Sequence, residues 1–598
     1  MPSQPRPDHG QATCQPNSGY LRAALVFLIV SVATLPRPVL LGEAVFDRPF
    51  ADRFLSVAGQ AGQTATQAAR PMHPEIEMLA RSASNDPLVR YRSYFAVAQS
   101  EDLDLFVWPD HAWARSHLRS GQMPQWRPDI MAGVPIRAVS LASPLSPLSW
   151  PAYILPMVQG RTLMLLLHLW LAGFAFYAFL LDRGRRQVSA LVGGLAYMLN
   201  PLSVTYLSYG DFVPVFALLP LNLMVVCRLI AAARPWRSGA ALAALTGLLF
   251  LSGGSVYAGY AVMIQFGAAV AFAPPSWRAR MRAVALCGPA TVVGLAAAGI
   301  ELLPLLDLAA QSLRTPDKYA ATNGLPMVGL LSWFFPHFFG HPGRGDFVGG
   351  FVFFRHFSGF YGLSPGTLVM GLAVVGAVSA RARGAAMVVL MLDGFLLLLG
   401  YAPAHGVLAK LIPGLDSFHL LRLLIVGFLV QAYLAAQGVD ALLEGRLSRR
   451  PLWILCGLMI LMVVVMDVWS RLGAGPAASA MWLHVHYLAG SVSVLLSPRM
   501  LVPVVLIAGL LILATVAGRQ QRMAPIAAWV LLTGVGIELI VLAWPSLPSA
   551  PADAVAGPRG DTDALRAVAS RPGRVVGLTE PDSFPPSLGD HLPANTAA

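Results

Sequence analysis

Long apolar runs separated by short polar segments dominate the chain. A helix needs about 20 apolar residues to cross a bilayer, and thirteen runs approach or reach that length, the shortest at 239–253. The pattern therefore predicts an all-α polytopic membrane protein with about thirteen transmembrane helices. The predicted spans are 21–41, 163–181, 188–207, 212–232, 239–253, 254–273, 283–306, 361–380, 385–402, 420–441, 451–469, 500–518 and 524–544.

Composition agrees with this class, because 56% of the 598 residues are hydrophobic and only 12% are charged. Ordinary soluble domains carry about 25% charged residues. The formal net charge is +12, and all but two of the 42 basic residues are arginines. A basic balance also suits nucleic acid, but these arginines lie in short segments between apolar runs, as the positive-inside rule requires. We therefore expect membrane lipids as partners and no nucleic acid.

The arginine clusters also predict sidedness. All six fall on one side of the membrane if residues 1–20 are cytoplasmic. Removing one span would move several clusters to the other side, so the short run at 239–253 is kept as a span. The clusters are Arg183/Arg185/Arg186, Arg234/Arg237, Arg278/Arg280/Arg282, Arg381/Arg383, Arg446/Arg449/Arg450 and Arg519/Arg522. The long polar segments then face outward, at 42–162, 307–360, 403–419, 470–499 and 545–598.

The first outward loop, 42–162, contains the polar and aromatic stretch EDLDLFVWPDHAWARSHLRSGQMPQW. Pro109 suits the first turn of a helix and Gly121 suits its end. Between them, Trp113 and Leu118 could rest on the bilayer surface. We expect a short helix that lies on the outer face of the membrane.

Motifs in a fixed order run along most of the chain. The first loop has Asp-Leu at 102–103, Pro109, Ser-Gly-Gln-Met-Pro-Gln-Trp-Arg-Pro at 120–128 and Gly-Val-Pro at 133–135. Later segments are ELLPLLDLAAQSLR (301–314), FFPHFFG (334–340), FYGLSPGTL (360–368), LIPGLDSFHLLRLL (411–424) and LAAQGVDALL (434–443). Together they resemble the bacterial YfhO-like membrane proteins, a branch of the GT-C glycosyltransferase superfamily.

The resemblance implies a GT-C-like module over 21–544 in a bacterial inner membrane, with both large loops and the C-terminus in the periplasm. It implies transfer of a sugar from a polyprenyl-phosphate-linked donor to a lipid or cell-envelope glycan acceptor, with inversion at the anomeric carbon. The tail 545–598 ends in LPANTAA (592–598), which resembles the point where relatives continue into an outward soluble domain. We therefore expect the tail to be a truncated form or a vestige of that domain.

Asp102, with Asp104 beside it, matches the acidic position of the family. A carboxylate there is expected either to remove the acceptor's proton or to bind a divalent ion, magnesium or manganese. No cofactor beyond such an ion is expected, and the sequence does not identify metal ligands. The alternative is that both acids are solvated loop residues.

Arg115 and Arg119 are candidates to hold a lipid phosphate, or else they extend along the interface with their charges in water. Trp126 is a candidate to stack on a sugar, or else it anchors the loop at the interface. Further candidate contacts lie at span edges and in the second loop. They are Glu301, Asp307, Arg314, Lys318, His337 and Arg422. Glu301 stands out, because an ionisable group within a span is usually functional.

The sequence departs from the family at His419, where relatives have arginine, and at Val256, where they have glutamine. Two other function classes therefore stay open: a transporter or flippase of lipid-linked saccharides, and a catalytically silent scaffold. The long first loop and the lack of a visible repeat favour an enzyme over a transporter.

Overall fold

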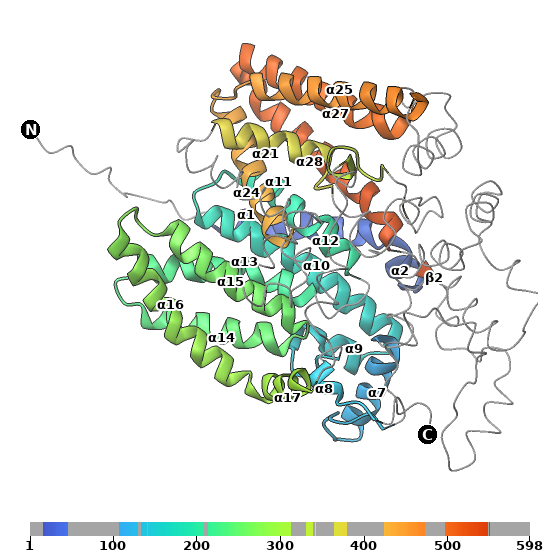
Figure 1. Cartoon of the computed structure of the whole chain (residues 1–598), viewed down its shortest axis with the longest axis vertical. Coiled ribbons are helices and arrows are strands. Elements are labelled where there is room, and N and C mark those ends of the chain that lie inside the picture. The colour runs from blue at the N-terminus through green and yellow to red at the C-terminus, as the bar shows by residue number, and fades with distance from the viewer. Residues whose placement is uncertain are drawn as a thin grey trace, which may run out of the picture.

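The computed structural model describes residues 16–45, 107–128, 133–139, 142–207, 213–311, 331–338, 341, 364–379, 424–472, 497–547 and 549–550. The elements in these ranges are nearly all helices (Figure 1). Seven of them are long and apolar enough to cross a membrane. These are α10 (Met157–Asp182), α13 (Val213–Ala231), α15 (Ser255–Phe272), α24 (Leu424–Leu443), α25 (Arg450–Leu472), α27 (Pro498–Arg519) and α28 (Ala524–Ala543).

Further apolar segments are shorter or bent. α16 (Trp277–Ala297) and α17 (Gly299–Ala310) pass the same test together but meet at an angle of 81°. The shorter apolar helices are α1 (Pro16–Thr34), α11 (Gln187–Met198), α14 (Trp236–Leu251) and α21 (Thr367–Ser379). Every predicted span within the described ranges is thus helical, and the multi-pass membrane class is confirmed. The count of thirteen stays a prediction, and the span at 385–402 lies outside the described residues.

Three predicted spans are not continuous helices. The run 21–41 divides at Leu35 into α1 and α2 (Pro36–Leu41), because Pro36 restricts the residue before it. The run 188–207 divides into α11 and α12 (Pro201–Thr205), and the Asn200 carboxamide caps α12 by accepting the Ser203 N–H at 2.9 Å. The third, 283–306, is the bent pair α16–α17. Proline and capping chemistry therefore interrupts the first two of these runs, which hydropathy alone predicts as single spans.

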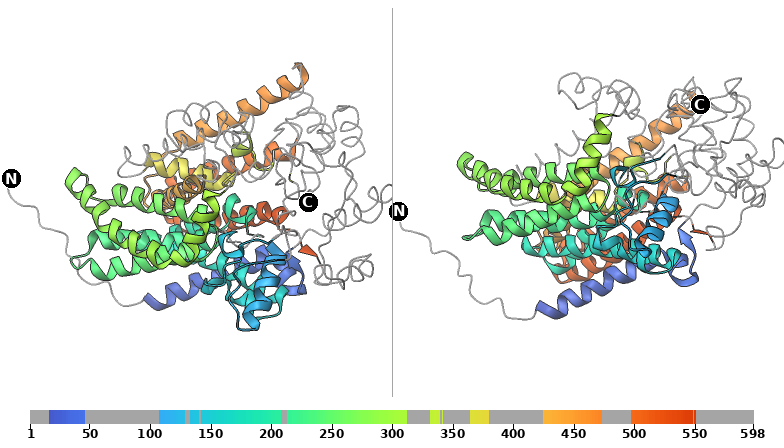
Figure 2. Two further views of the ribbon diagram at one scale, coloured as in Figure 1. Left: turned by 60° about the horizontal axis from the view of Figure 1, so that its bottom comes forward. Right: turned by 90° about the horizontal axis from the view of Figure 1, so that it is seen from below.

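α13, α14, α15 and α16 lie side by side in Figures 1 and 2. Gln265 of α15 joins the other three through its buried carboxamide. Its Oε1 accepts from Asn222 Nδ2 (3.1 Å) and Thr246 Oγ1 (3.2 Å), and its Nε2 donates to Thr291 Oγ1 (2.7 Å). Polar side chains buried between membrane helices gain from such pairing, since lipid offers them no partner.

A second helix pair, α21 and α24, crosses at two glycines. A β-carbon at Gly376 would collide with the Leu434 carbonyl oxygen, and one at Gly438 with the Leu372 carbonyl oxygen. The absence of these carbons lets the two backbones touch. Glu538 of α28 then caps α21, because its carboxylate accepts the N–H of Thr367 and Leu368.

Two short strands pair the segment that follows α2 with the segment that follows α28. β1 (Ala44–Val45) pairs antiparallel with β2 (Ser549–Ala550). Beside them, the Glu43 carboxylate accepts from Arg37 and from the Ser549 hydroxyl. The chain after α2 and the chain after α28 therefore lie on the same face of the bundle. The remaining short helices are α7 (Trp108–Arg119), α8 (Ile136–Val139), η2 (Pro147–Ser149), α9 (Trp150–Ile154), α19 (Leu331–Phe334), η9 (Gln521–Met523) and η10 (Trp544–Ser546).

Candidate functional site

The short helix predicted in the first outward loop is α7. Pro109 lies in its first turn, and Gly121 follows it with a left-handed φ of +76°. One face of α7 is buried in the protein. Trp113 and Leu118, expected to rest on the bilayer surface, instead pack half-buried against a small apolar cluster that includes Tyr153 of α9. α7 is therefore fixed to the body of the protein.

Asp110 of α7 forms a buried ion pair. Its Oδ1 lies 2.5 Å from Nη1 of Arg127, and the two residues are 4% and 7% exposed. The Arg127 backbone in turn pairs with Val134 through two 2.8 Å hydrogen bonds. The Trp126 ring lies directly against Gly133, whose φ of +112° favours glycine. The Pro- and Gly-rich motif thus forms a closed loop that holds Arg127 in place.

A second buried ion pair joins α8 to α17. Arg137 Nε lies 3.3 Å from Oε1 of Glu301, and Arg137 Nη2 donates to the Ile300 carbonyl at 2.9 Å. That carbonyl would normally accept from residue 304, but Pro304 has no N–H. Glu301 is buried, and its partner is an arginine from the segment 42–162.

A third arginine completes the group. Arg161, in the first turns of α10, is 2% exposed, and its guanidinium lies 4.9 Å from the centroid of the Trp108 ring. Nearby, burial raises the pKa of the Tyr153 hydroxyl well above its usual range, while the Ser143 backbone N–H and the charge of Arg161 oppose this rise. The carboxylates of Asp110 and Glu301 also raise this pKa, which places both within electrostatic reach of Tyr153.

We call this set the arginine cluster: Asp110, Arg127, Arg137, Tyr153, Arg161 and Glu301. Its three arginines and two carboxylates give a formal charge of +1. Figure 1 shows three of the elements that carry it, α7, α8 and α9, grouped beside α17, and α9 packs against α10. Burying so many charges is costly, and such clusters in membrane proteins are usually functional.

The other predicted site residues have varied surroundings. Arg115 is half-buried, and burial together with nearby Arg119 lowers its pKa. Arg119 is exposed and donates weakly to the Ile154 carbonyl at 3.4 Å. Trp126 is 54% exposed, and Asp307 is exposed on α17. Five predicted residues lie outside the described ranges: Asp102, Asp104, Arg314, Lys318 and Arg422.

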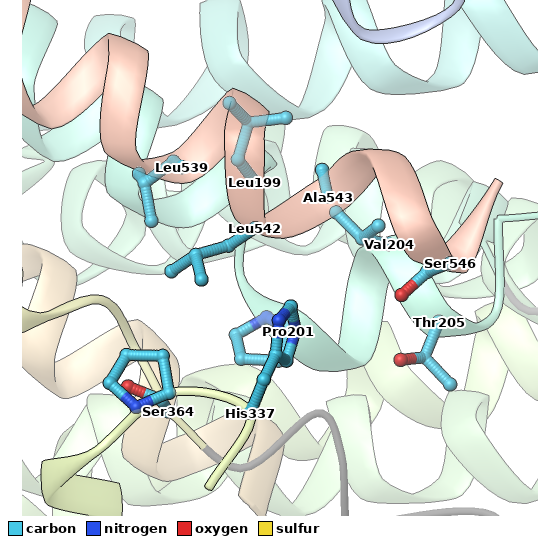
Figure 3. Close-up of a pocket in the computed structure, with 11 residues that line it drawn as sticks. Leu199, Pro201, Val204, Thr205, His337, Ser364, Leu539, Leu542, Ala543 and Ser546 are labelled. Carbon is cyan, nitrogen blue, oxygen red and sulfur yellow. The ribbon is translucent and has the colours of Figure 1, made fainter. Parts of the chain in front are cut away.

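His337 lines a separate pocket beside α12 and the end of α28 (Figure 3). Its φ of 55° is rare for a residue with a side chain, and its ring meets that of His341 at 4.8 Å between centroids. His341 Nε2 lies 2.9 Å from the Ser546 hydroxyl. The pocket has about 350 Å³ of empty space including its open mouth, with Thr205, Ser364 and Ser546 among its polar lining residues.

Sequence reasoning missed most of the arginine cluster. Asp110 is not among the candidate acids that the sequence indicates, Arg127 lies within the 120–128 motif, and Arg137 and Arg161 have no signal beyond their position near apolar runs. Among the described residues, no group of three or more His, Cys, Asp or Glu side chains could hold a metal ion.

The fold and the cluster define a multi-pass helical membrane protein with buried arginine–carboxylate pairs at one end of its bundle. Comparison with protein-family models, with curated proteins and with solved structures finds no match.

Proposed function

We propose that this protein is a GT-C-type membrane glycosyltransferase. It transfers a sugar from a polyprenyl-phosphate-linked donor to a lipid or cell-envelope glycan acceptor on the periplasmic face of a bacterial inner membrane. The proposal rests on the resemblance of its motifs to YfhO-like proteins. The observation that carries it is the buried arginine cluster at the end of the bundle.

The cluster suits a reaction in which phosphate leaves. As the glycosidic bond to the donor breaks, negative charge grows on the phosphate oxygens, and nearby cations stabilise it. Arginine does this well because its planar guanidinium donates two parallel hydrogen bonds. Since Arg161 is 2% exposed, its charge acts in a low-dielectric setting, where electrostatic interactions are strongest.

The proposed base adjoins the cluster in sequence. Asp104 and Asp102 precede the fully buried Val107 by three and five residues. Chain segments of these lengths span at most about 11 Å and about 18 Å. In the proposed step, the acceptor hydroxyl oxygen bonds to the anomeric carbon, and the bond from that carbon to the donor phosphate breaks. The Asp102 carboxylate takes the hydroxyl proton, and the phosphate leaves with the electron pair. A single displacement of this kind inverts the anomeric centre.

Transfer by the purified full chain tests the proposal. The chain is reconstituted in nanodiscs with radiolabelled polyprenyl-phosphate sugars and an extract of bacterial envelope lipids, with magnesium, with manganese or with EDTA. Labelled product that depends on Asp102 would support the proposal, and the EDTA arm separates a base from a metal ligand. Donor translocation without transfer would favour the flippase, and neither activity with any of these donors would contradict the proposed glycosyltransferase.

Variants of Arg161 provide a second test of the proposal. In Arg161→Gln we expect the donor to bind about tenfold or more weakly, because a charge-assisted contact is lost. Arg161→Lys keeps the charge but not the paired geometry, so it should recover part of the loss. Exposed Arg234→Gln, on the opposite side of the membrane by the arginine parity, is the matched control and should change donor binding little. Donor affinity unchanged in a folded Arg161→Gln would remove the phosphate role of the cluster.

A further inference from the structure

A positively charged surface lies where α14 and α16 begin, away from the arginine cluster. Two large aromatic side chains are exposed there, Trp236 at 65% and Trp277 at 74%. We call this region the Arg–Trp surface: Trp236, Arg237, Trp277, Arg278, Arg280 and Arg282. All four of its arginines are exposed.

The two helices hold these residues close together. Gly294 of α16 meets the Ala243 carbonyl of α14, and Gly247 meets the Gly294 carbonyl and Ala297, so the helices run in the same direction in close contact. Trp236 precedes Gly247 by eleven residues, and Ala283 precedes Gly294 by the same number. At about 1.5 Å per residue, Arg282 and Arg280 lie within about one helical turn of the level of Trp236.

No acidic residue balances this charge along a long stretch of chain. The sequence has no Asp or Glu between Asp211 and Glu301, and none of the four arginines forms an ion pair with a described residue. Three of the other arginines assigned to the same side by parity are paired, as Arg185 is with Asp440 at 3.2 Å. The Arg–Trp surface therefore carries more charge than its protein contacts use.

Helix stability does not explain these arginines either. Cations are unfavourable near a helix N-terminus, where the helix dipole is positive. Arg237 is the second residue of α14, and Arg278 is the second residue of α16. Arg519, by contrast, lies in the last turn of α27, where a cation is favourable.

The two tryptophans indicate the level in the membrane at which the Arg–Trp surface lies. Exposed tryptophans of membrane proteins concentrate at the level of the lipid headgroups. The Arg237 guanidinium lies 5.2 Å from the centroid of the Trp236 ring. The arginines are thus at the level where lipid phosphates lie, and clusters of basic residues at that level attract anionic lipids.

We propose that the Arg–Trp surface binds the headgroup of an anionic phospholipid, such as phosphatidylglycerol, from the leaflet that it meets. The arginines contact the phosphate, and the two indole rings lie beside the glycerol and upper acyl chains. This site is independent of the proposed glycosyltransferase activity.

Lipid binding to the purified full chain in a neutral detergent tests the proposal. Native mass spectrometry counts bound phosphatidylglycerol and phosphatidylcholine across a titration. We expect phosphatidylglycerol to bind more tightly, and its advantage to fall about tenfold or more in Arg278→Gln/Arg280→Gln/Arg282→Gln. The matched control Arg519→Gln/Arg522→Gln removes two arginines at another turn, and it should keep the advantage.

Three results would overturn the proposal. One is an unchanged preference for phosphatidylglycerol in the triple variant, and another is an equal loss in the control. The third is full competition by inorganic phosphate at the same concentration, which would identify a general anion site. A thermal unfolding midpoint is measured for each variant, and Arg237→Gln serves as a milder variant if the triple variant does not fold.

Discussion

In the first outward loop, Gly133 has a backbone conformation that favours glycine and also lacks space for a side chain. Its φ is +112°, and the Trp126 ring occupies the space that a β-carbon would need. We expect Gly133→Ala to lower the stability of the protein by about 2–3 kcal/mol. Gly121→Ala, where φ is +76° with nothing within 4 Å, should cost only about 1 kcal/mol.

Thermal unfolding in detergent measures both glycine variants. Adding Trp126→Ala to Gly133→Ala should recover the steric part of the loss and leave the backbone part. Equal midpoints for Gly133→Ala and Gly121→Ala would contradict the packing described for Trp126.

Glu43 gives a pH dependence with a defined sign. Hydrogen bonds from Arg37 and Ser549 lower its pKa to about 2, against about 4.3 for an unperturbed glutamate. Because the folded pKa is the lower one, this carboxylate stabilises the fold fully above the unfolded pKa. The stabilisation is lost as pH falls from about 5 towards 2.

The comparison of wild type with Glu43→Gln isolates this effect. The wild type should have the higher thermal midpoint at pH 7, and the difference should shrink through pH 4 and 3. A difference that stays constant over that range would show that the carboxylate does not titrate as the β1–β2 contact requires.

At the residue scale, the sequence predicted the ends of α7 correctly but did not predict which distant side chains are buried together. Pro109 and Gly121 mark the ends of α7 correctly, because both act through their own backbone. Arg161 was missed, because its burial depends on Trp108, which precedes it by 53 residues in the sequence. A contact of that kind has no signal in hydropathy or spacing.

Among the helices, hydropathy located every described span but not the breaks within them. Beyond the bend between α16 and α17, Arg137 binds the Ile300 carbonyl that Pro304 leaves without its usual helical partner. Proline alone marks a weak point in a helix, and the distant arginine determines what the free carbonyl binds. The sequence therefore predicted a span at 283–306 and could not predict its direction beyond Ala298.

The crossing of α21 and α24 makes a direct prediction at this scale. Even a methyl group at Gly376 would collide with the Leu434 backbone, so the helices would have to separate. We expect Gly376→Ala to destabilise the protein by about 3 kcal/mol. Gly457→Ala, with nothing within 4 Å, should be neutral or slightly stabilising, because alanine favours helix. Equal unfolding midpoints for the two variants would refute the close crossing.

For the whole molecule, the arginine parity stays a prediction of topology, and labelling tests it. Single cysteines replace exposed Ser120 and exposed Arg234 in a chain whose four native cysteines are alanine. In sealed vesicles, a membrane-impermeant maleimide should label only one of the two positions from a given side. Labelling of both from the same side would contradict the predicted topology.

The central claim concerns the site as a whole, in which a carboxylate of the first outward loop acts beside buried arginines. Its most direct test is the initial rate of sugar transfer by wild type and by Asp102→Asn, with Asp104→Asn for comparison. We predict transfer by the wild type and a loss of about 10²–10⁴-fold in Asp102→Asn, the usual contribution of a general base. Transfer at the wild-type rate by folded Asp102→Asn would contradict the claim.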